Sequence, residues 1–290
     1  MIAIAGGTGR LGSLLTTRLA ERGLDVRVVT RDPARAAHLR DLPIQIVTAD
    51  VRDRAGIRAA LRGTQSVVSA VQGFAGPGGV SPQSVDRDGN TNLIDAAAEF
   101  GIDVILMSVV GAAADHPMEL FRAKHAAEQH LIGRSTRWTV VRATAFLELW
   151  AEIMTKPVVF GRGENPINFV AVQDVAAAAQ QAVLDPDLRG QIVEIGGPRN
   201  LTFNQLATLL HQARGTSGKV RHIPRPALRL AAPVSRQARA AVAMDTIDLT
   251  FTPAQPHPDQ PLTEPLDALA HASELTRSRS HPPARPRSRV

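Results

Sequence analysis

The residues with the most specific chemistry stand at the beginning of the chain, where glycines follow a short apolar run. The run is Ile2–Ala5, and the glycines after it are Gly6, Gly7, Gly9 and Gly12. Glycines at this spacing let the backbone approach a phosphate closely, and the N-terminus of a following helix presents free N–H groups and a positive dipole to it. We therefore expect a dinucleotide phosphate site. The residues expected to form it are Gly6, Gly7, Thr8, Gly9, Arg10, Leu11 and Gly12.

A plain glycine turn is the alternative, and the elements around the glycines argue against it. An apolar run precedes them, and leucines at helical spacing follow them; this strand–turn–helix context supports a dinucleotide motif. Further apolar runs predict strands at 25–30, 44–48, 66–71, 103–108 and 137–142, and helical patterns lie near 34–41, 54–62, 84–100 and 118–133. Such alternation predicts an α/β fold with a Rossmann-type doubly wound parallel sheet, whose ligand lies at the carboxyl ends of the strands.

The pattern changes after the sixth expected strand, and this predicts three regions. Residues 1–143 are expected to form the dinucleotide-binding domain. Residues 144–252 are expected to form a smaller α/β substrate lobe, partly interleaved with the main sheet. Its short strands are expected near 158–160, 168–170, 192–195 and 219–223, and its helices near 172–184, 202–213 and 226–244. Residues 253–290 are rich in proline and arginine and have few large apolar side chains, so we expect a disordered tail.

Composition narrows the chemistry. The 290 residues include no cysteine, which excludes a disulfide or a thiolate nucleophile, and the nine histidines show no spacing for a metal. Much of the net charge of +6 comes from five arginines within residues 277–289, so the rest is close to neutral. We expect a solvated tail; nucleic-acid binding through it is the weaker alternative. The longest apolar run, 104–114, is too short and interrupted to span a membrane, and the N-terminus leaves no room for a signal peptide. A cytoplasmic protein is expected.

Several further motifs, in this order, resemble an atypical short-chain dehydrogenase/reductase of the NmrA-like group over residues 1–250. They are Gly6–Gly12, Thr30–Pro33, Asp86–Asp95, Arg122–Glu128, Val141–Phe146, Val172–Ala176 and Gly196–Pro198. The resemblance implies an NAD(P) cofactor. It places Asp50 and Val51, after the third strand, against the adenine, and Ala70 and Val71, after the fourth, beside a ribose.

The end of the second strand discriminates between the two nicotinamide cofactors. An acidic residue there binds the ribose 2′-hydroxyl of NAD, whereas an arginine pairs with the 2′-phosphate of NADP. Both types occur, as Arg31 and Asp32. Since Pro33 suits the first position of a helix, Asp32 is placed to cap that helix. This leaves Arg31 for the phosphate, with Arg10 as a second positive group, and in the resembled family the matching arginine contacts the 2′-phosphate. NADP(H) is preferred, and NAD(H) remains the alternative.

The catalytic half of the site lacks a usual member. Related reductases use a serine together with a tyrosine and a lysine that are four residues apart. The chain has Ser108 and Lys124 but no tyrosine, and Leu120 stands at the tyrosine position. Lys124 lies on a helical stripe with Leu120, Ala127 and Leu131. Its amine either binds a cofactor ribose or extends from the edge of the stripe to water. Some tyrosine-lacking relatives use this lysine for proton transfer. Ser108 is either catalytic or a strand-end cap.

Two functions are consistent with a cofactor site that has its expected residues and a catalytic set that lacks its tyrosine. The first is an NADP(H)-binding oxidoreductase that acts on a small carbonyl, quinone-like or conjugated substrate. Phe146, Trp150 and Met154 recur every four residues and suggest an apolar substrate wall, although they could equally belong to the core. The second is a non-catalytic sensor that binds NAD(P) and reports its redox state to a protein partner, as regulators of the NmrA-like group do.

Overall fold

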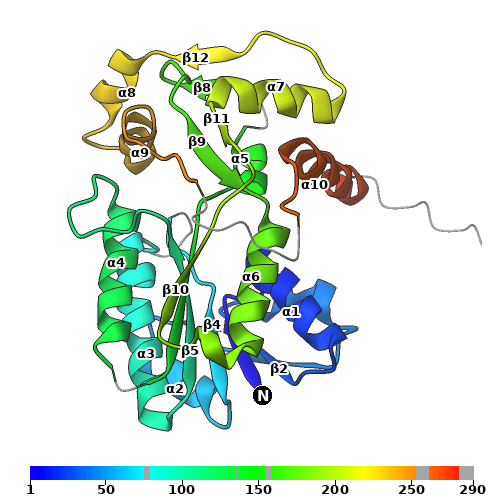
Figure 1. Ribbon diagram of the computed structural model, residues 1–290, viewed down its shortest axis with the longest axis vertical. Coiled ribbons are helices and arrows are strands. Elements are labelled where there is room, and N and C mark those ends of the chain that lie inside the picture. Colours follow the sequence, from blue (N-terminus) through cyan, green and yellow to red (C-terminus); the bar gives the residue numbers. More distant parts are fainter. Residues whose placement is uncertain (75–78, 135, 155–157, 253–260, 281–290) are drawn as a thin grey trace, which may run out of the picture. The chain divides into compact units, whose positions relative to one another are not determined.

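The computed structural model describes residues 1–74, 79–134, 136–154, 158–252 and 261–280, without the side chains of residues 236–237 and 273–280 (Figure 1). The chain forms two compact units. The first comprises Met1–Ala145, Val172–Gly196 and Phe251–His257, and the second comprises Phe146–Ala171, Gly197–Thr250 and Pro258–Val290. The chain thus leaves the first unit two residues after the expected boundary. It returns for residues 172–196, which we had assigned to the smaller lobe.

A seven-stranded parallel sheet forms the centre of the first unit, in the order β10-β6-β5-β4-β1-β2-β3. The strands are β1 (Ile2–Ala5), β2 (Val26–Thr30), β3 (Ile44–Thr48), β4 (Ser66–Ser69), β5 (Asp103–Val109), β6 (Trp138–Ala143) and β10 (Gln191–Ile195). The predicted Rossmann-type sheet is confirmed. Strand β10 comes from the region assigned to the smaller lobe, which was expected to interleave partly with the main sheet, and it pairs in parallel with β6 at the edge of this sheet.

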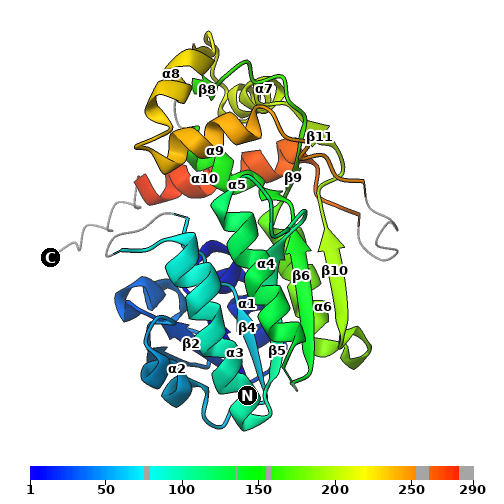
Figure 2. The same cartoon turned by 90° about the vertical axis from the view of Figure 1, so that its left-hand side faces the viewer.

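Helices cover both faces of the sheet (Figures 1 and 2). The helices α1 (Arg10–Glu21) and α6 (Val172–Leu184) pack together on one face, while α2 (Arg54–Leu61), α3 (Asp88–Phe100) and α4 (Glu119–Ile132) cover the other. Shorter helical turns are η1 (Pro33–Leu39), η2 (Pro82–Arg87) and η3 (Pro186–Leu188). Helix α1 buries Leu11, Leu15 and Leu19, whose four-residue spacing places them on one stripe. Burying that stripe fixes the start of α1 directly after the glycine turn.

The second unit contains short strands and helices. Strand β9 (Ile167–Val170) pairs antiparallel with β11 (Asn200–Leu201), and β8 (Val158–Phe160) pairs parallel with β12 (Arg221–Ile223). The two-residue strand β7 (Ala145–Phe146) is where the chain passes from the first unit into the second. The helices are α5 (Leu147–Ile153), α7 (Phe203–Arg214), α8 (Arg225–Ala231) and α9 (Arg236–Met244). The region expected to be helical over 226–244 is therefore two helices, and Pro233 lies between them.

Helix α10 (Pro265–Ser280) lies within the segment that we expected to be disordered. It packs on α7 and α5, and it buries Ala268 and Leu269. The composition of the whole tail concealed this short stretch of leucine and alanine, which suffices to form a buried stripe. Residues 253–260 and 281–290, including Arg285, Arg287 and Arg289, lie outside the described residues. In the part of the chain that is described, no helix has the length and apolar character needed to cross a membrane.

Candidate cofactor and active site

The glycine turn is packed so closely that side chains have no room. Gly6 has φ +80°, and a Cβ there would lie 2.8 Å from the carbonyl oxygen of Ala70. A Cβ on Gly12 would lie 2.2 Å from the carbonyl oxygen of Gly6. Gly9 is the N-cap of α1 and supplies no side chain to cap the helix. No side chain of the N-cap residue therefore stands between the start of α1 and an anion such as a pyrophosphate, which helix N-termini bind.

The end of β2 shows how Arg31 and Asp32 divide their roles. Asp32 is the N-cap of η1, and its Oδ1 accepts a hydrogen bond of 2.9 Å from the Ala34 amide. This confirms the predicted cap. Arg31 is exposed, so its guanidinium remains accessible to a 2′-phosphate. The hydroxyls of Thr8 and Thr30 lie 2.9 Å apart and connect the glycine turn to the end of this strand.

Asp50 and Val51, the residues expected to contact the adenine, form contacts with other residues of the chain. Asp50 forms an ion pair of 2.6 Å with Arg52. The hydrogen bond from Arg52 lowers the pKa of Asp50, and the charge of Arg31 contributes in the same direction. Val51 is buried in the core, and its carbonyl oxygen accepts a hydrogen bond of 3.0 Å from Asn92. These contacts hold the loop after β3 in one conformation and place its aspartate near Arg31.

Lys124 does not extend to water. Its side chain is 6% exposed, so the alternative of a lysine that reaches solvent is wrong. The amine donates to the carbonyl oxygens of Met107, at 3.0 Å, and Val71, at 3.2 Å, and lies 3.0 Å from Oδ1 of Asp86. The ammonium thus has two hydrogen-bond acceptors on the segments of β4 and β5 and an ion pair with Asp86 of η2, whose Oδ1 has no hydrogen-bond partner among the described residues. Of the three contacts, the one with the Val71 carbonyl is the longest.

Asp86, which the sequence pattern did not single out, is the third group at the Lys124 amine. Its side chain is wholly buried, and its Oδ2 accepts a hydrogen bond of 2.7 Å from the Gly73 amide. Burial raises the pKa of Asp86, while the charge of Lys124 and the Gly73 hydrogen bond oppose this rise. Asn90, one turn later, donates to the carbonyl oxygen of Asp86 and accepts from Ser69. In the sequence, Asp86 and Asn90 are four residues apart and share a helical stripe with Leu93. This spacing is the signal that could have pointed to Asp86 and Asn90.

Ser108 lies at the end of β5 and is 5% exposed. Among the described residues its Oγ has no hydrogen-bond partner, so the structure gives no support to the alternative of a strand-end cap. Its register partner on β6 is Arg142, which pairs with Glu128 and Glu194. A buried hydroxyl without a partner is costly unless a ligand completes it. Ser108 directly follows Met107, whose carbonyl holds Lys124.

The position of the missing tyrosine carries no replacement hydroxyl. Leu120 is partly buried, and Phe121 stacks on His116 with ring centroids 3.9 Å apart. Burial lowers the pKa of His116, and its Nδ1 accepts a hydrogen bond from the Met118 amide. Within the described part of the chain, no group of histidine, aspartate and glutamate side chains could hold a metal ion.

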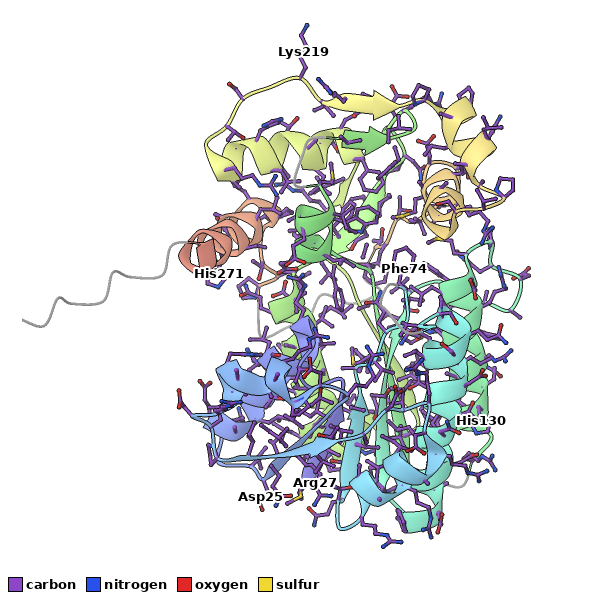
Figure 3. The ribbon with its side chains drawn as sticks, turned by 180° about the vertical axis from the view of Figure 1, so that it is seen from behind. Asp25, Arg27, Phe74, His130, Lys219 and His271 are labelled. Atoms are coloured by element: carbon purple, nitrogen blue, oxygen red, sulfur yellow. The ribbon has the colours of Figure 1, made fainter. Side chains whose placement is uncertain are left out.

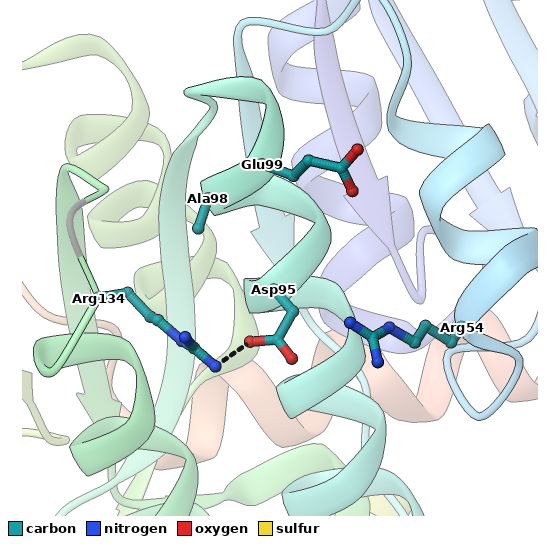
Figure 4. A pocket seen from close by; sticks show the side chains of 5 residues that line it. All are labelled: Arg54, Asp95, Ala98, Glu99 and Arg134. Atoms are coloured by element: carbon teal, nitrogen blue, oxygen red, sulfur yellow. Dashed lines mark ion pairs between the residues drawn. The ribbon is translucent and has the colours of Figure 1, made fainter.

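A cavity of about 350 Å³ opens on the outer side of the helices α2 and α3 (Figure 4). It is lined by Arg54, Asp95, Ala98, Glu99 and Arg134, and none of these belongs to the predicted cofactor site. Arg134 pairs with Asp95 at 2.6 Å, and Glu99 pairs with Arg58. The two acidic side chains that line the cavity are thus both paired with arginines, which is typical of a solvated helix surface.

Comparisons with known proteins agree with this geometry. A family model described as NAD(P)H-binding matches residues 6–186. The chain is 28% identical over 221 residues to the NAD(P)H azoreductase of Xenophilus azovorans, with 74% of each chain covered. It is 26% identical over 222 residues to quinone oxidoreductase 2 of Escherichia coli, covering 74% of this chain and 75% of that protein.

Solved structures share the fold. The NADPH-dependent quinone oxidoreductase QOR2 of Escherichia coli, solved as a complex with NADPH, superimposes with a TM-score of 0.75 at 22% identity. The alignment covers 93% of this chain and 99% of that one. The chain therefore belongs to the NAD(P)H-binding family of atypical short-chain dehydrogenases/reductases, and NAD(P)H is its cofactor.

Proposed function

We propose that this protein is an NADPH-dependent oxidoreductase that reduces a small carbonyl, quinone-like or conjugated acceptor. The observation that carries the proposal is the position of Lys124 and Ser108 at the carboxyl ends of β4 and β5, in the same sheet as the glycine turn after β1. In doubly wound sheets this edge is where a dinucleotide lies. The azoreductase and the quinone oxidoreductase similar to this chain act on conjugated acceptors of this class.

The cofactor supplies a hydride to the acceptor, and the chain's own residues position and complete the reaction. The glycine turn and the start of α1 hold the pyrophosphate, and Arg31 pairs with the 2′-phosphate. Lys124 binds the ribose next to the nicotinamide. Ser108 donates a hydrogen bond to the acceptor atom on which negative charge develops. Since the chain has no tyrosine, Lys124 is also the group that we propose as proton donor.

The choice of NADP(H) over NAD(H) rests on two residues. Asp32 uses its carboxylate to cap η1, which removes it as a partner for a ribose 2′-hydroxyl. Arg31 is exposed beside it and acts on Asp50 through its charge. A guanidinium in this place favours a cofactor that carries the additional phosphate.

Turnover tests the proposal directly. Oxidation of NADPH and of NADH is followed by absorbance against a panel of quinones, azo dyes and aldehydes, with the wild type, Lys124→Met and Ser108→Ala. We expect NADPH to be oxidised with at least one acceptor, and both variants to lose most of that rate while they stay folded. Tight NADPH binding without turnover on the whole panel would refute the proposed activity.

A cofactor sensor is the second candidate, and one observation favours it. The ammonium of Lys124 is satisfied within the protein, and the residue at the tyrosine position has no hydroxyl. A sensor must bind NADP⁺ and NADPH with different affinities, since a ligand shifts a conformation only through differential binding. Calorimetric titration of both forms measures this difference. Equal affinities would remove the basis for sensing.

A further inference from the structure

We propose that Asp86 is a positioning residue of the cofactor site, whose buried carboxylate fixes the ammonium of Lys124 at the ends of β4 and β5. This inference rests on the proposed role of Lys124 toward the cofactor. The two side chains are 0% and 6% exposed, and their charged atoms lie 3.0 Å apart. They are 38 residues apart in the chain, on η2 and α4, which pack against each other.

Asp86 differs in kind from the other two acceptors of Lys124. The carbonyl oxygens of Val71 and Met107 are neutral, whereas Asp86 is a wholly buried carboxyl group that pairs with the ammonium as an ion. Removing one partner of a buried ion pair leaves the other charge buried without an opposite charge, which is strongly destabilising. When a ribose hydroxyl replaces the Val71 carbonyl, the contact with Asp86 keeps the amine in place.

The carboxylate itself cannot follow a moving lysine. Its second oxygen accepts from the Gly73 amide at 2.7 Å, and its backbone carbonyl accepts from Asn90 at 2.7 Å. Gly73 is packed so tightly that a Cβ there would lie 2.2 Å from the carbonyl oxygen of Ser81. These two hydrogen bonds hold Asp86 independently of Lys124, and its carboxylate defines where the ammonium of Lys124 sits.

The small number of lysines makes this arrangement directly observable. The chain has three, Lys124, Lys156 and Lys219, and Lys219 is exposed at the surface (Figure 3). In protein labelled with ¹⁵N-lysine, a buried ammonium that is hydrogen-bonded and ion-paired exchanges its protons slowly and gives a visible N–H signal, whereas an exposed one does not. We expect such a signal in the wild type, and its loss in Lys124→Met assigns it to Lys124.

The test substitutes Asp86→Asn, with Asp88→Asn as the matched control. Asp88 belongs to the same motif, but its side chain is 51% exposed and pairs with Arg87. We expect Asp86→Asn to abolish the Lys124 signal and to weaken NADPH binding at least tenfold, and Asp88→Asn to retain the signal with affinity within twofold. An unchanged signal and affinity in folded Asp86→Asn would overturn the proposal.

A double substitution separates positioning from simple support of the fold. If Asp86 acts through Lys124, adding Asp86→Asn to Lys124→Met should leave NADPH affinity within twofold of Lys124→Met alone. The double variant also removes both buried charges, so it remains informative if Asp86→Asn does not fold. A further tenfold loss in the double variant would overturn the proposal. Neither readout requires turnover, so a wild type that binds NADPH without reducing any acceptor refutes the proposed activity alone.

Discussion

Replacing Gly12 by alanine should weaken NADPH binding because it forces α1 away from the glycine turn. A Cβ at this position would lie 2.2 Å from the carbonyl oxygen of Gly6 and 2.8 Å from Cα of Gly7. Ordinary contacts begin at 3.4 Å, so the helix and the turn would have to separate by about 1.2 Å. Both opposing atoms belong to the backbone and cannot rotate out of the way.

The expected magnitude follows from this displacement. Insertion of a methyl group into a closely packed site costs about 1–3 kcal/mol. A loss of about 1.4 kcal/mol in cofactor binding corresponds to a tenfold weaker affinity. Because the first turn of α1 is the part that meets the pyrophosphate, we expect Gly12→Ala to lose at least this factor in affinity, in addition to a lower free energy of unfolding.

Fluorescence titration with NADPH and unfolding in urea measure the two effects. Gly133→Ala is the matched control, since it follows the last turn of α4 with φ −75°, and a Cβ there would meet its nearest neighbour, the Gln129 carbonyl oxygen, at 3.4 Å. It should bind NADPH within twofold of the wild type. Wild-type affinity and stability in Gly12→Ala would show that the close approach of α1 to the turn does not shape the cofactor site.

Three further predictions address the cofactor preference, the last helix and the buried carboxylate. Arg31→Ala should weaken NADPH binding about tenfold and leave NADH nearly unchanged, because one ion pair to the 2′-phosphate is lost; equal losses for both would refute the assignment. Leu269→Ala should lower the free energy of unfolding by about 2–5 kcal/mol, whereas Leu230→Ala, 85% exposed, should change it by less than about 0.5 kcal/mol; equal effects in urea unfolding would contradict the packing of α10. Since the native pKa of Asp86 is raised, the native state binds its proton more tightly than the unfolded chain. The free energy of unfolding of the wild type, relative to that of Asp86→Asn, should therefore fall as pH rises from the unfolded pKa through the native one. Urea unfolding of both proteins from pH 4 to 7 measures this difference. A wild-type advantage that grows with pH would contradict the raised pKa.

Short-range patterns explain how much of the fold was predictable. The bounds of β1, β3 and β8 are as expected, because apolar β-branched residues between turn residues define a strand locally. The cap by Asp32 was predictable for the same reason, since it involves an amide only two residues away. Alternation of strands and helices then restricts the topology to a parallel sheet.

Local sequence patterns do not predict which strands and helices pair when they lie far apart in the chain. Nothing local in residues 191–195 distinguishes an edge strand of the main sheet from a strand of the smaller unit, and α10 depends on burial of Leu269 against α7 and α5. In the site, the sequence by itself determined the glycine turn and the presence of Ser108 and Lys124. The tertiary structure alone decided that Lys124 meets Asp86, because that contact exists only when the order of the strands brings η2, β4, β5 and α4 together.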